Sequence, residues 1–392
     1  MAAAAALGSA GYQVDLFEAR PFLGGRATSY EVGGETIDNC QHILLRCCVN
    51  LLDFYRRLGV EKKIAWHKEF YFIEPGGSIS PLKAGLLPAP LHFTGSFLRA
   101  SWLTLGEKMA LGRALLDLRT ERASRHDLFE ITMLDWLREK KQPPNLIERF
   151  WRQVLVSAIN EDLDRMAAAH GFQVFWLGFL AAGNSYEMGI PAVPLGELYS
   201  ANAWRQFGNV RIHTRAKVAR IDGAGAVVDG ELRQADYYVQ ALPPPQDFDY
   251  SPITGIHLWF DREVTDLPHG TLLDRTIQWF FCKGNGSYLQ VVVSASRSLL
   301  EMPRQEVIDL TMRELAEFLP AVKDATLKKA HVVKEARATF SASPQAEKLR
   351  LSTRTAQPNV FLAGDWTNTG LPATIEGAVR SGNECAKLIV EA

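Results

Sequence analysis

The sequence has few cysteines, almost no net charge and no long apolar run. Its five cysteines are scattered over 392 residues without the spacing of a metal site, so we expect a reducing, cytoplasmic compartment and neither disulfides nor a metal centre. The 43 Lys and Arg against 44 Asp and Glu do not indicate binding to nucleic acid. No run reaches the roughly 18 apolar residues of a membrane span. The hydrophobic fraction of 47% is typical of a globular chain with a sizeable core.

A glycine-rich phosphate-binding turn is also lacking at the start of the chain. An Ala-rich helix at 2–7 is followed by Gly11 and by a strand at 12–18 that ends in Glu18. This is the second half of a dinucleotide-binding βαβ unit, in which the terminal acid binds ribose hydroxyls. The first strand and the Gly-x-Gly-x-x-Gly turn would lie before Met1. We therefore expect a misplaced start codon or a fragment, and weak diphosphate binding if this start is the true one.

A glycine pair and an arginine follow Glu18 at a short distance. Gly24 and Gly25 expose backbone N–H groups, and Arg26 adds a forked cation suited to a diphosphate. Most such triplets are simple turns. Their position eight residues after the acidic end of a nucleotide-type strand favours a diphosphate site.

The C-terminal region reads as a strand, a tight turn and a helix. Residues 360–363 are apolar, Gly364 permits the turn, and Asp365 lies where open α/β sheets bind ligands. Thr374 then precedes a helix that runs to about residue 389. The free N–H groups of a helix start suit an anion or a ring that becomes anionic on reduction, such as a flavin. The alternative is a helix that only closes an α/β core.

The middle of the chain is apolar and rich in aromatic residues. Residues 84–98 carry no formal charge and contain two prolines and two glycines. We interpret them as a buried lid or channel wall, with a loop that dips into a membrane surface as the alternative. Helices are predicted at 106–119, 131–140 and 145–158. Both interpretations of the 84–98 stretch suit an apolar substrate.

The remaining segments predict a second sheet and an interleaved organisation. Residues 188–196 read as a loop before a helix at 196–206. Further strands are predicted at 210–221, 237–242, 253–260, 277–281, 288–295 and 331–340, with a helix at 307–318. One domain would consist of residues 1–80, 190–250 and 341–392, and the other of residues 81–189 and 251–340.

These motifs together resemble the flavin-dependent amine oxidase and phytoene desaturase superfamily. The resemblance rests on Glu18-Ala-Arg, Gly24-Gly-Arg, Leu362-Ala-Gly-Asp-Trp-Thr, Ala373-Thr-Ile-Glu-Gly-Ala and Ser381-Gly. Three stretches are most similar to the bacterial hydroxysqualene dehydroxylases within it: Ile37-Asp-Asn-Cys-Gln-His-Ile-Leu-Leu, Glu148-Arg-Phe-Trp-Arg with Ala158-Ile-Asn, and Ala363 to Glu376. The resemblance implies an α/β fold, with a Rossmann-like FAD-binding domain interleaved with a mixed α+β substrate domain.

The resemblance also implies roles for single residues toward FAD. Glu18 would bind the adenosine ribose, the backbone of Val218 the adenine, and the N–H of Ile375 the flavin pyrimidine edge. The residues expected along the diphosphate, the ribityl chain and the flavin edge are Gly24, Gly25, Arg26, Gly364, Asp365 and Thr374. The chain departs from the pattern at Cys40, where a glycine is expected and where the thiol adds bulk.

The implied reaction is the reductive dehydroxylation of hydroxysqualene to squalene in hopanoid biosynthesis. It requires a hydrophobic isoprenoid substrate and an electron donor, and it makes a peripheral membrane contact conceivable. Asp38 and His42 are candidates for the acid that assists the leaving hydroxide, although His42 also fits a structural histidine. No hydrolase triad and no metal-ligand spacing is evident.

Three alternatives stay open from the sequence. The first is oxidative desaturation of a C30 or C40 isoprenoid by the same cofactor. The second, prompted by the missing turn, is a truncated, flavin-less chain with a binding or structural role. The third is amine oxidation, which the apolar middle segment disfavours.

Overall fold

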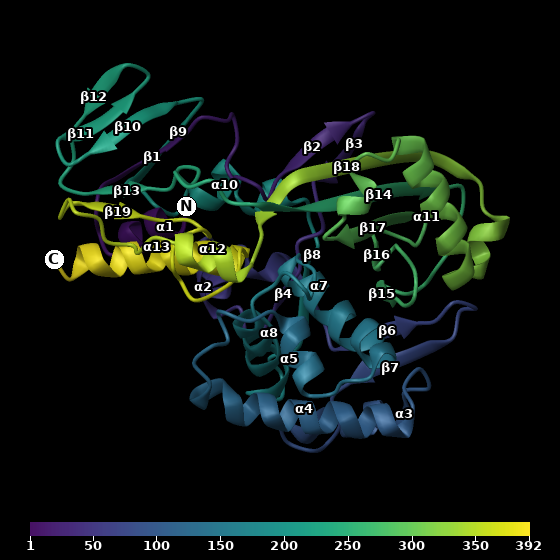
Figure 1. Cartoon of the computed structure of the whole chain (residues 1–392). Coiled ribbons are helices and arrows are strands. Elements are labelled where there is room, and N and C mark those ends of the chain that lie inside the picture. The colour runs from purple at the N-terminus through teal and green to yellow at the C-terminus, as the bar shows by residue number, and fades with distance from the viewer.

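The computed structural model describes residues 1–392, and Figure 1 shows three regions. One region holds both ends of the chain, a second contains the large sheet, and the third is a block of helices at the bottom of the view. All five cysteines are free. No helix combines the length and the apolar character needed to cross a membrane.

The region with both chain ends is built from segments far apart in the sequence. Two parallel strand pairs form its sheets: β1 (Val14–Glu18) with β9 (Val210–Thr214), and β13 (Tyr238–Gln240) with β19 (Val360–Leu362). Helices α1 (Ala2–Ser9) and α13 (Ile375–Val390) pack against each other beside them. Gly382 permits this contact, because a Cβ there would lie 2.8 Å from the backbone nitrogen of Ala3. The predicted strand, turn and helix at the C-terminus are confirmed.

Smaller elements complete this region. Helices α2 (Val49–Arg57) and α12 (Pro344–Leu349) and the 3₁₀ helix η1 (Glu61–Lys63) lie in it. The hairpin of β2 (Ser29–Val32) and β3 (Glu35–Asp38) turns at Gly33 and Gly34. A three-stranded antiparallel sheet contains β10 (Val218–Asp222), β11 (Gly225–Val228) and β12 (Glu231–Arg233).

Residues 188–206 differ from the prediction of a loop and one helix. Residues Met188–Pro191 form β8, which pairs with β4 (Leu44–Leu45) and β5 (Ile64–His67). Gly189 allows these strands to approach, since a Cβ there would lie 2.7 Å from a methyl group of Ile64. The helix is split into α9 (Leu195–Leu198) and α10 (Ala201–Trp204) because Ser200 has an extended backbone and begins the second helix.

A seven-stranded sheet has the order β18-β14-β17-β16-β15-β6-β7. Its strands are β6 (Glu69–Ile73), β7 (Ile79–Lys83), β14 (Tyr250–Phe260), β15 (His269–Leu272), β16 (Trp279–Cys282), β17 (Tyr288–Ser294) and β18 (Leu327–Phe340). Helix α11 (Arg304–Phe318) covers one face, with the 3₁₀ helices η5 (Arg297–Leu299) and η6 (Pro320–Asp324) nearby. Since β6 and β7 pair in this sheet, we propose a boundary at residue 69 in place of residue 80. The rest of the domain division stays a prediction.

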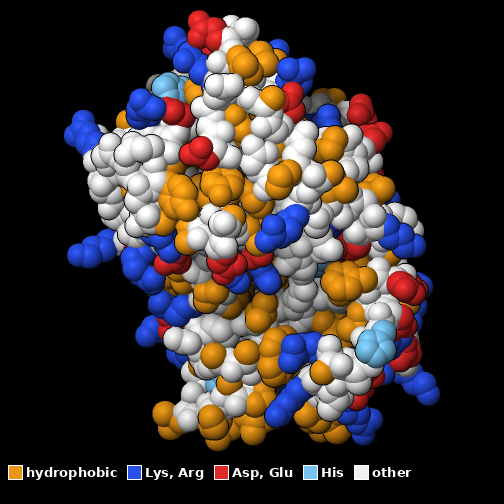
Figure 2. All heavy atoms as spheres, turned by 90° about the vertical axis from the view of Figure 1, so that its left-hand side faces the viewer, with side chains coloured by type: hydrophobic (Ala, Val, Ile, Leu, Met, Phe, Trp, Pro, Cys, Tyr) orange, Lys and Arg blue, Asp and Glu red, His pale blue; other side chains and the backbone are white.

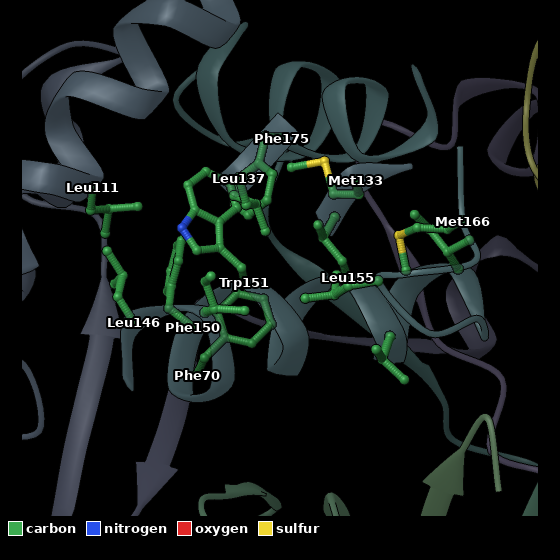
Figure 3. Close-up of a cluster of buried hydrophobic side chains, with 14 of the residues drawn as sticks. Phe70, Leu111, Met133, Leu137, Leu146, Phe150, Trp151, Leu155, Met166 and Phe175 are labelled. Carbon is green, nitrogen blue, oxygen red and sulfur yellow. The ribbon is translucent and has the colours of Figure 1, made fainter. Parts of the chain in front are cut away.

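The helical block lies on the side of the sheet opposite α11. Its elements are η2 (Leu91–Phe93), α3 (Thr94–Arg99), α4 (Leu105–Ser124), α5 (Met133–Glu139), α6 (Pro144–Leu146), η3 (Ile147–Arg152), α7 (Gln153–Ile159), α8 (Ala168–Phe175) and η4 (Trp176–Leu180). The segments η3 and η4 are π-helical turns. Figure 3 shows Trp151 among Phe150, Leu137 and Phe175 in the core of this block. The predicted helices at 106–119, 131–140 and 145–158 are confirmed.

Candidate functional site

One large cavity of about 1980 Å³ runs from the region of the chain ends into the helical block. The nine residues predicted to bind the cofactor all line it, although they come from five separate parts of the chain. They are Glu18, Gly24, Gly25, Arg26, Val218, Gly364, Asp365, Thr374 and Ile375. His42 also lines the cavity, whereas Asp38 does not.

The Gly24–Arg26 loop presents its backbone and one cation to the cavity. Gly24 and Gly25 have φ angles of 120° and 60°, which a side chain would strain. A Cβ at Gly24 would collide with the carbonyl oxygen of Ala27, while a Cβ at Gly25 would meet nothing within 4 Å. Arg26 pairs with Asp365 and also donates to the carbonyl oxygen of Ala338 at 3.0 Å. This loop therefore has an open backbone at Gly25 beside a guanidinium group.

The start of α13 supplies a second set of backbone donors. The hydroxyl oxygen of Thr374 accepts the N–H of Gly377 at 3.1 Å and caps the helix. The carboxylate of Glu376 is occupied elsewhere, because it accepts the N–H groups of Asn50 and Leu51 at 3.1 and 2.8 Å. The first N–H groups of an α-helix have no partner within the helix. Thr374 and Ile375 thus place an electropositive helix end at the cavity wall.

Glu18 and Val218 lie at the other end of this part of the cavity. Glu18 ends β1, and its Oε1 accepts the N–H of Arg20 at 2.8 Å. Val218 begins β10, and both residues are half-buried. A carboxylate and a strand backbone are therefore available in the same half of the cavity as the Gly24–Arg26 loop.

The geometry separates the two candidate acids. Asp38 is 8% exposed, and its Oδ1 accepts from the Ser29 hydroxyl at 2.6 Å and from the N–H of Leu195 at 2.9 Å. The ammonium group of Lys283 lies 3.9 Å from its other oxygen. Asp38 therefore ties the β2–β3 hairpin to α9 and does not line the cavity. Of the two candidates, His42 is the one in contact with the cavity.

His42 is one of three polar side chains at the junction between the cofactor-type residues and the helical block. The others are Gln41 and Gln173, and we call the three the polar trio. Each has a terminal atom that is buried and has no partner: Nε2 of His42 and Oε1 of both glutamines. Burial lowers the pKa of His42 to about 4, against the opposing charge of Asp38. The imidazole is therefore neutral at pH 7.

The sequence did not lead us to predict Gln173 as a residue of the site. The signal was present, since Gln173 is the one amide in the apolar run at 171–182. Its Nε2 donates to the carbonyl oxygen of Gly370, four residues before the capping Thr374 of α13. Asn160 lies in a stretch that the sequence did single out, and its side chain is fully engaged. Its Nδ2 donates to the Ser251 carbonyl oxygen at 3.0 Å, and its Oδ1 accepts the N–H of Ala295 at 2.8 Å.

The far half of the cavity is an apolar chamber. Phe93 and Phe97 of the 84–98 stretch line it, together with a ring of aromatic and aliphatic residues. This ring includes Phe70, Phe150, Leu111, Val154, Phe175 and Phe179. The stretch is thus a chamber wall on its inner side, while Leu86, Leu87, Leu91 and Leu98 are exposed on its outer side. The inner side fits the interpretation as a channel wall, while contact with a membrane surface stays a prediction.

The family model described as flavin containing amine oxidoreductase matches residues 1–390. A hydroxysqualene dehydroxylase of Rhodopseudomonas palustris is 30% identical over 424 residues, which cover 100% of this chain and 96% of that protein. A 15-cis-phytoene desaturase of Capsicum annuum is 26% identical over 448 residues, covering 98% of this chain and 75% of that protein.

Two solved structures have the same fold at low identity. An oxidoreductase from Methanosarcina mazei gives a TM-score of 0.70 at 16% identity and covers 100% of this chain and 97% of its own. Cyclohexylamine oxidase from Brevibacterium oxydans gives a TM-score of 0.69 at 16% identity. The match covers 100% of this chain and 96% of that protein. The predicted fold, a Rossmann-like unit interleaved with a substrate unit, is confirmed. Since the family model spans nearly all residues, the chain belongs to the flavin containing amine oxidoreductase family and is an oxidoreductase with FAD as its cofactor.

Proposed function

We propose that this chain removes the hydroxyl group of hydroxysqualene reductively to give squalene, a step in hopanoid biosynthesis. Its partners are this hydrophobic isoprenoid and an electron donor. One observation carries the proposal: an apolar chamber meets the cofactor-type residues at the polar trio, each of which has one buried terminal atom without a protein partner. A hydrocarbon substrate has no use for such groups, whereas a hydroxylated isoprenoid can satisfy them. The similarity to a hydroxysqualene dehydroxylase supports the same choice.

The residues in the first half of the cavity fit FAD. We propose that Glu18 binds the ribose and the backbone of Val218 the adenine, while Arg26 and the open backbone at Gly25 hold the diphosphate. The Gly364–Asp365 turn lies along the ribityl chain, and the α13 start at Thr374 and Ile375 binds the flavin edge. The absence of any atom within 4 Å of a Cβ at Gly25 supports this arrangement. When bound, FAD supplies the two-electron redox chemistry.

The apolar chamber orients the substrate and keeps water away from the reacting carbon. Its walls carry phenylalanines from six elements, including Phe93 of η2, Phe97 of α3 and Phe150 of η3. A long isoprenoid has no hydrogen-bonding groups along its chain, so its binding there depends on burial of apolar surface. Exclusion of water also strengthens each hydrogen bond at the polar trio.

The polar trio would hold the hydroxyl group at the junction. A half-turn of the His42 ring or of the Gln41 amide about its last torsion would turn its free atom to the opposite side, and such torsions are soft. The hydroxyl oxygen must gain a proton when the C–O bond breaks and water leaves, and the reduced cofactor FADH2 would carry this proton as well as the hydride. Neutral His42 can donate an N–H hydrogen bond to this oxygen, while the amide groups of Gln41 and Gln173 fix its position.

Turnover under opposite redox conditions tests the proposal. We expect the FAD-loaded chain to convert hydroxysqualene to squalene, measured by gas chromatography, when dithionite is present and oxygen is absent. Conversion of phytoene or squalene to a product with additional double bonds, in the presence of a quinone acceptor, would contradict it. A colourless preparation that binds no FAD would favour the flavin-less alternative.

Oxidative desaturation is the second candidate, and the similarity to phytoene desaturases supports it. The polar trio separates the two reactions. The double variant His42→Phe and Gln173→Leu should reduce dehydroxylation at least a hundredfold, because the hydroxyl loses its partners. The same variant should leave desaturation of a hydrocarbon within a few-fold of the wild type.

Substrate solubility bears on where the chain works. Squalene-like molecules dissolve in lipid and hardly at all in water. We therefore also propose that the chain is cytoplasmic and contacts a membrane surface peripherally through the 84–98 stretch.

A further inference from the structure

Seven large apolar side chains are exposed on η2, on α3, on the outer side of α4 and on the loop before them. We call this set the apolar ridge. Leu86 is fully exposed, and the other six are 51–67% exposed. Its members are Leu86, Leu87, Leu91, Leu98, Leu105, Met109 and Leu116. Figure 2 shows hydrophobic side chains along the lower edge of the molecule, the edge at which α3 and α4 lie in Figure 1.

Helix α4 is apolar on two sides, which a helix on a water-facing surface does not require. Its inner side buries Leu111, Ala114 and Leu118 in the core. Its outer side exposes Leu105, Met109 and Leu116, which recur at helical spacing. The ammonium group of Lys108 donates to the carbonyl oxygen of Leu98 at 3.0 Å and joins α4 to α3. The ridge is therefore continuous across the two helices.

The charges around the ridge have one sign. Between residues 81 and 123, every exposed charged side chain is basic. The acidic ones in this range, Glu107, Asp117 and Glu121, are buried or half-buried. Three of the exposed arginines, Arg99, Arg113 and Arg119, form no ion pair. Apolar side chains among unpaired arginines are complementary to a lipid bilayer with anionic headgroups.

The cavity reaches the surface within this ridge. Leu91, Leu98 and Leu116 line the apolar chamber and are also exposed, each by more than half. Arg119 and Lys108 line the same end of the cavity. A molecule that enters here can pass from the ridge into the chamber along the side chains of Leu91, Leu98 and Leu116.

We propose that the apolar ridge rests on an anionic bilayer and that the cavity opens directly into the lipid, so that the isoprenoid enters and leaves through the ridge. This proposal rests on the proposed function only for the identity of the isoprenoid substrate. Binding to the bilayer follows from the ridge and its arginines. Entry from the lipid follows from the shared residues of ridge and chamber.

Vesicle sedimentation of the FAD-loaded chain tests the contact. We expect binding to vesicles of phosphatidylcholine with phosphatidylglycerol, and at least tenfold weaker binding to phosphatidylcholine alone. The triple variant Leu86→Ser, Leu87→Ser and Leu105→Ser should lower the bound fraction at least tenfold. None of these three residues lines the cavity.

A matched control is available elsewhere on the surface. Leu349, Leu351 and Val390 are 40%, 38% and 52% exposed and lie outside the cavity. Their triple change to Ser should leave vesicle binding unchanged. Equal binding by the ridge variant and the wild type would overturn the proposal, as would a dimer that forms through the ridge while vesicle binding is absent.

Turnover rates in micelles and in vesicles distinguish an effect on substrate entry from an effect on the reaction itself. With hydroxysqualene in detergent micelles, the ridge variant should turn over as fast as the wild type. With the substrate embedded in vesicles, it should lose at least tenfold in rate. Equal rates in both settings would overturn entry from the lipid. If no preparation acts on hydroxysqualene while the ridge variant still loses vesicle binding, the proposed reaction fails and the membrane contact stands.

Discussion

Arg26 and Asp365 form an ion pair on the cavity wall although 339 residues separate them in the chain. Arg26 follows the glycine pair after β1, and Asp365 follows β19. The Asp365 side chain is only 10% exposed, so its carboxylate has little access to water. The pair thus joins the loop that we assign to the FAD diphosphate to the turn that we assign to the ribityl chain.

This pair gives a prediction for cofactor affinity. Arg26→Ala should weaken FAD binding ten- to a hundredfold, because about 1.5–3 kcal/mol of charge-assisted hydrogen bonding is lost. The control is Arg138→Ala, on the exposed side of α5. Fluorescence titration with FAD measures the affinity. An affinity equal to that of the control would remove Arg26 from the diphosphate site.

The two glycines before Arg26 should respond differently to alanine. Gly24→Ala should destabilise the fold by about 3 kcal/mol, since its Cβ meets the Ala27 carbonyl oxygen and its backbone is strained. Gly25→Ala should cost about 1 kcal/mol, because only its positive φ is strained. Its methyl group enters the cavity, so FAD affinity should still fall. Urea unfolding and FAD titration of both variants check this, and equal stabilities would contradict it.

His269 makes stability depend on pH. It is fully buried among aromatic rings and His67, neither ring nitrogen has a partner, and burial lowers its pKa to about 3. The unfolded chain binds a proton near pH 6.5 and the folded chain does not, so stability falls as the pH drops below 6.5. The contribution is about 2 kcal/mol at pH 5.

His269→Phe should therefore reduce the loss of stability between pH 7 and pH 5. It also replaces two unpartnered polar atoms by an apolar edge, so the variant should be no less stable at pH 7. Urea unfolding at both pH values measures the effect, with the exposed His126→Phe as control. A pH dependence equal to that of the wild type would assign the acid sensitivity to other groups.

Asn160 should matter for stability more than for chemistry. It has a left-handed backbone with φ 60°, and its amide joins the end of α7 to β14 and to Ala295. Asn160→Ala should cost about 3 kcal/mol, because a backbone carbonyl and an N–H lose their partners. Thermal unfolding measures this, with the exposed Asn368→Ala as control. A stable variant with lost activity would instead place Asn160 in the reaction.

The sequence predicts what local patterns encode. The α13 start was predicted because a capping threonine and a proline precede an apolar helical repeat, and Thr374 does cap the helix. Strand β15 (His269–Leu272) was not predicted, because four residues with a glycine and a threonine give no alternating pattern. Its place between β16 and β6 comes from tertiary pairing.

The candidate site also contains residues that local patterns predict and residues whose positions depend on tertiary packing. The glycines, Arg26 and Asp365 are recognisable because each follows a strand end. Asp38 and His42 are four residues apart, and the sequence could not separate them. The direction of each side chain depends on how the segment after β3 packs against α9 and the seven-stranded sheet. Gln173 contributes to the wall only because α8 turns it toward Gly370.

The parallel pairs β1–β9 and β13–β19 constrain when the cofactor can load. Each pair joins strands more than a hundred residues apart, and α13 must pack on α1 beside them. During translation, β1 and the Gly24–Arg26 loop are synthesised before their partners, β9 and Asp365. Until residue 390 has been synthesised, the cavity lacks the wall formed by the Gly364–Asp365 turn and the start of α13. FAD therefore binds after translation of this region, and a cell short of flavin would accumulate chains that are fully made but open at the cofactor site.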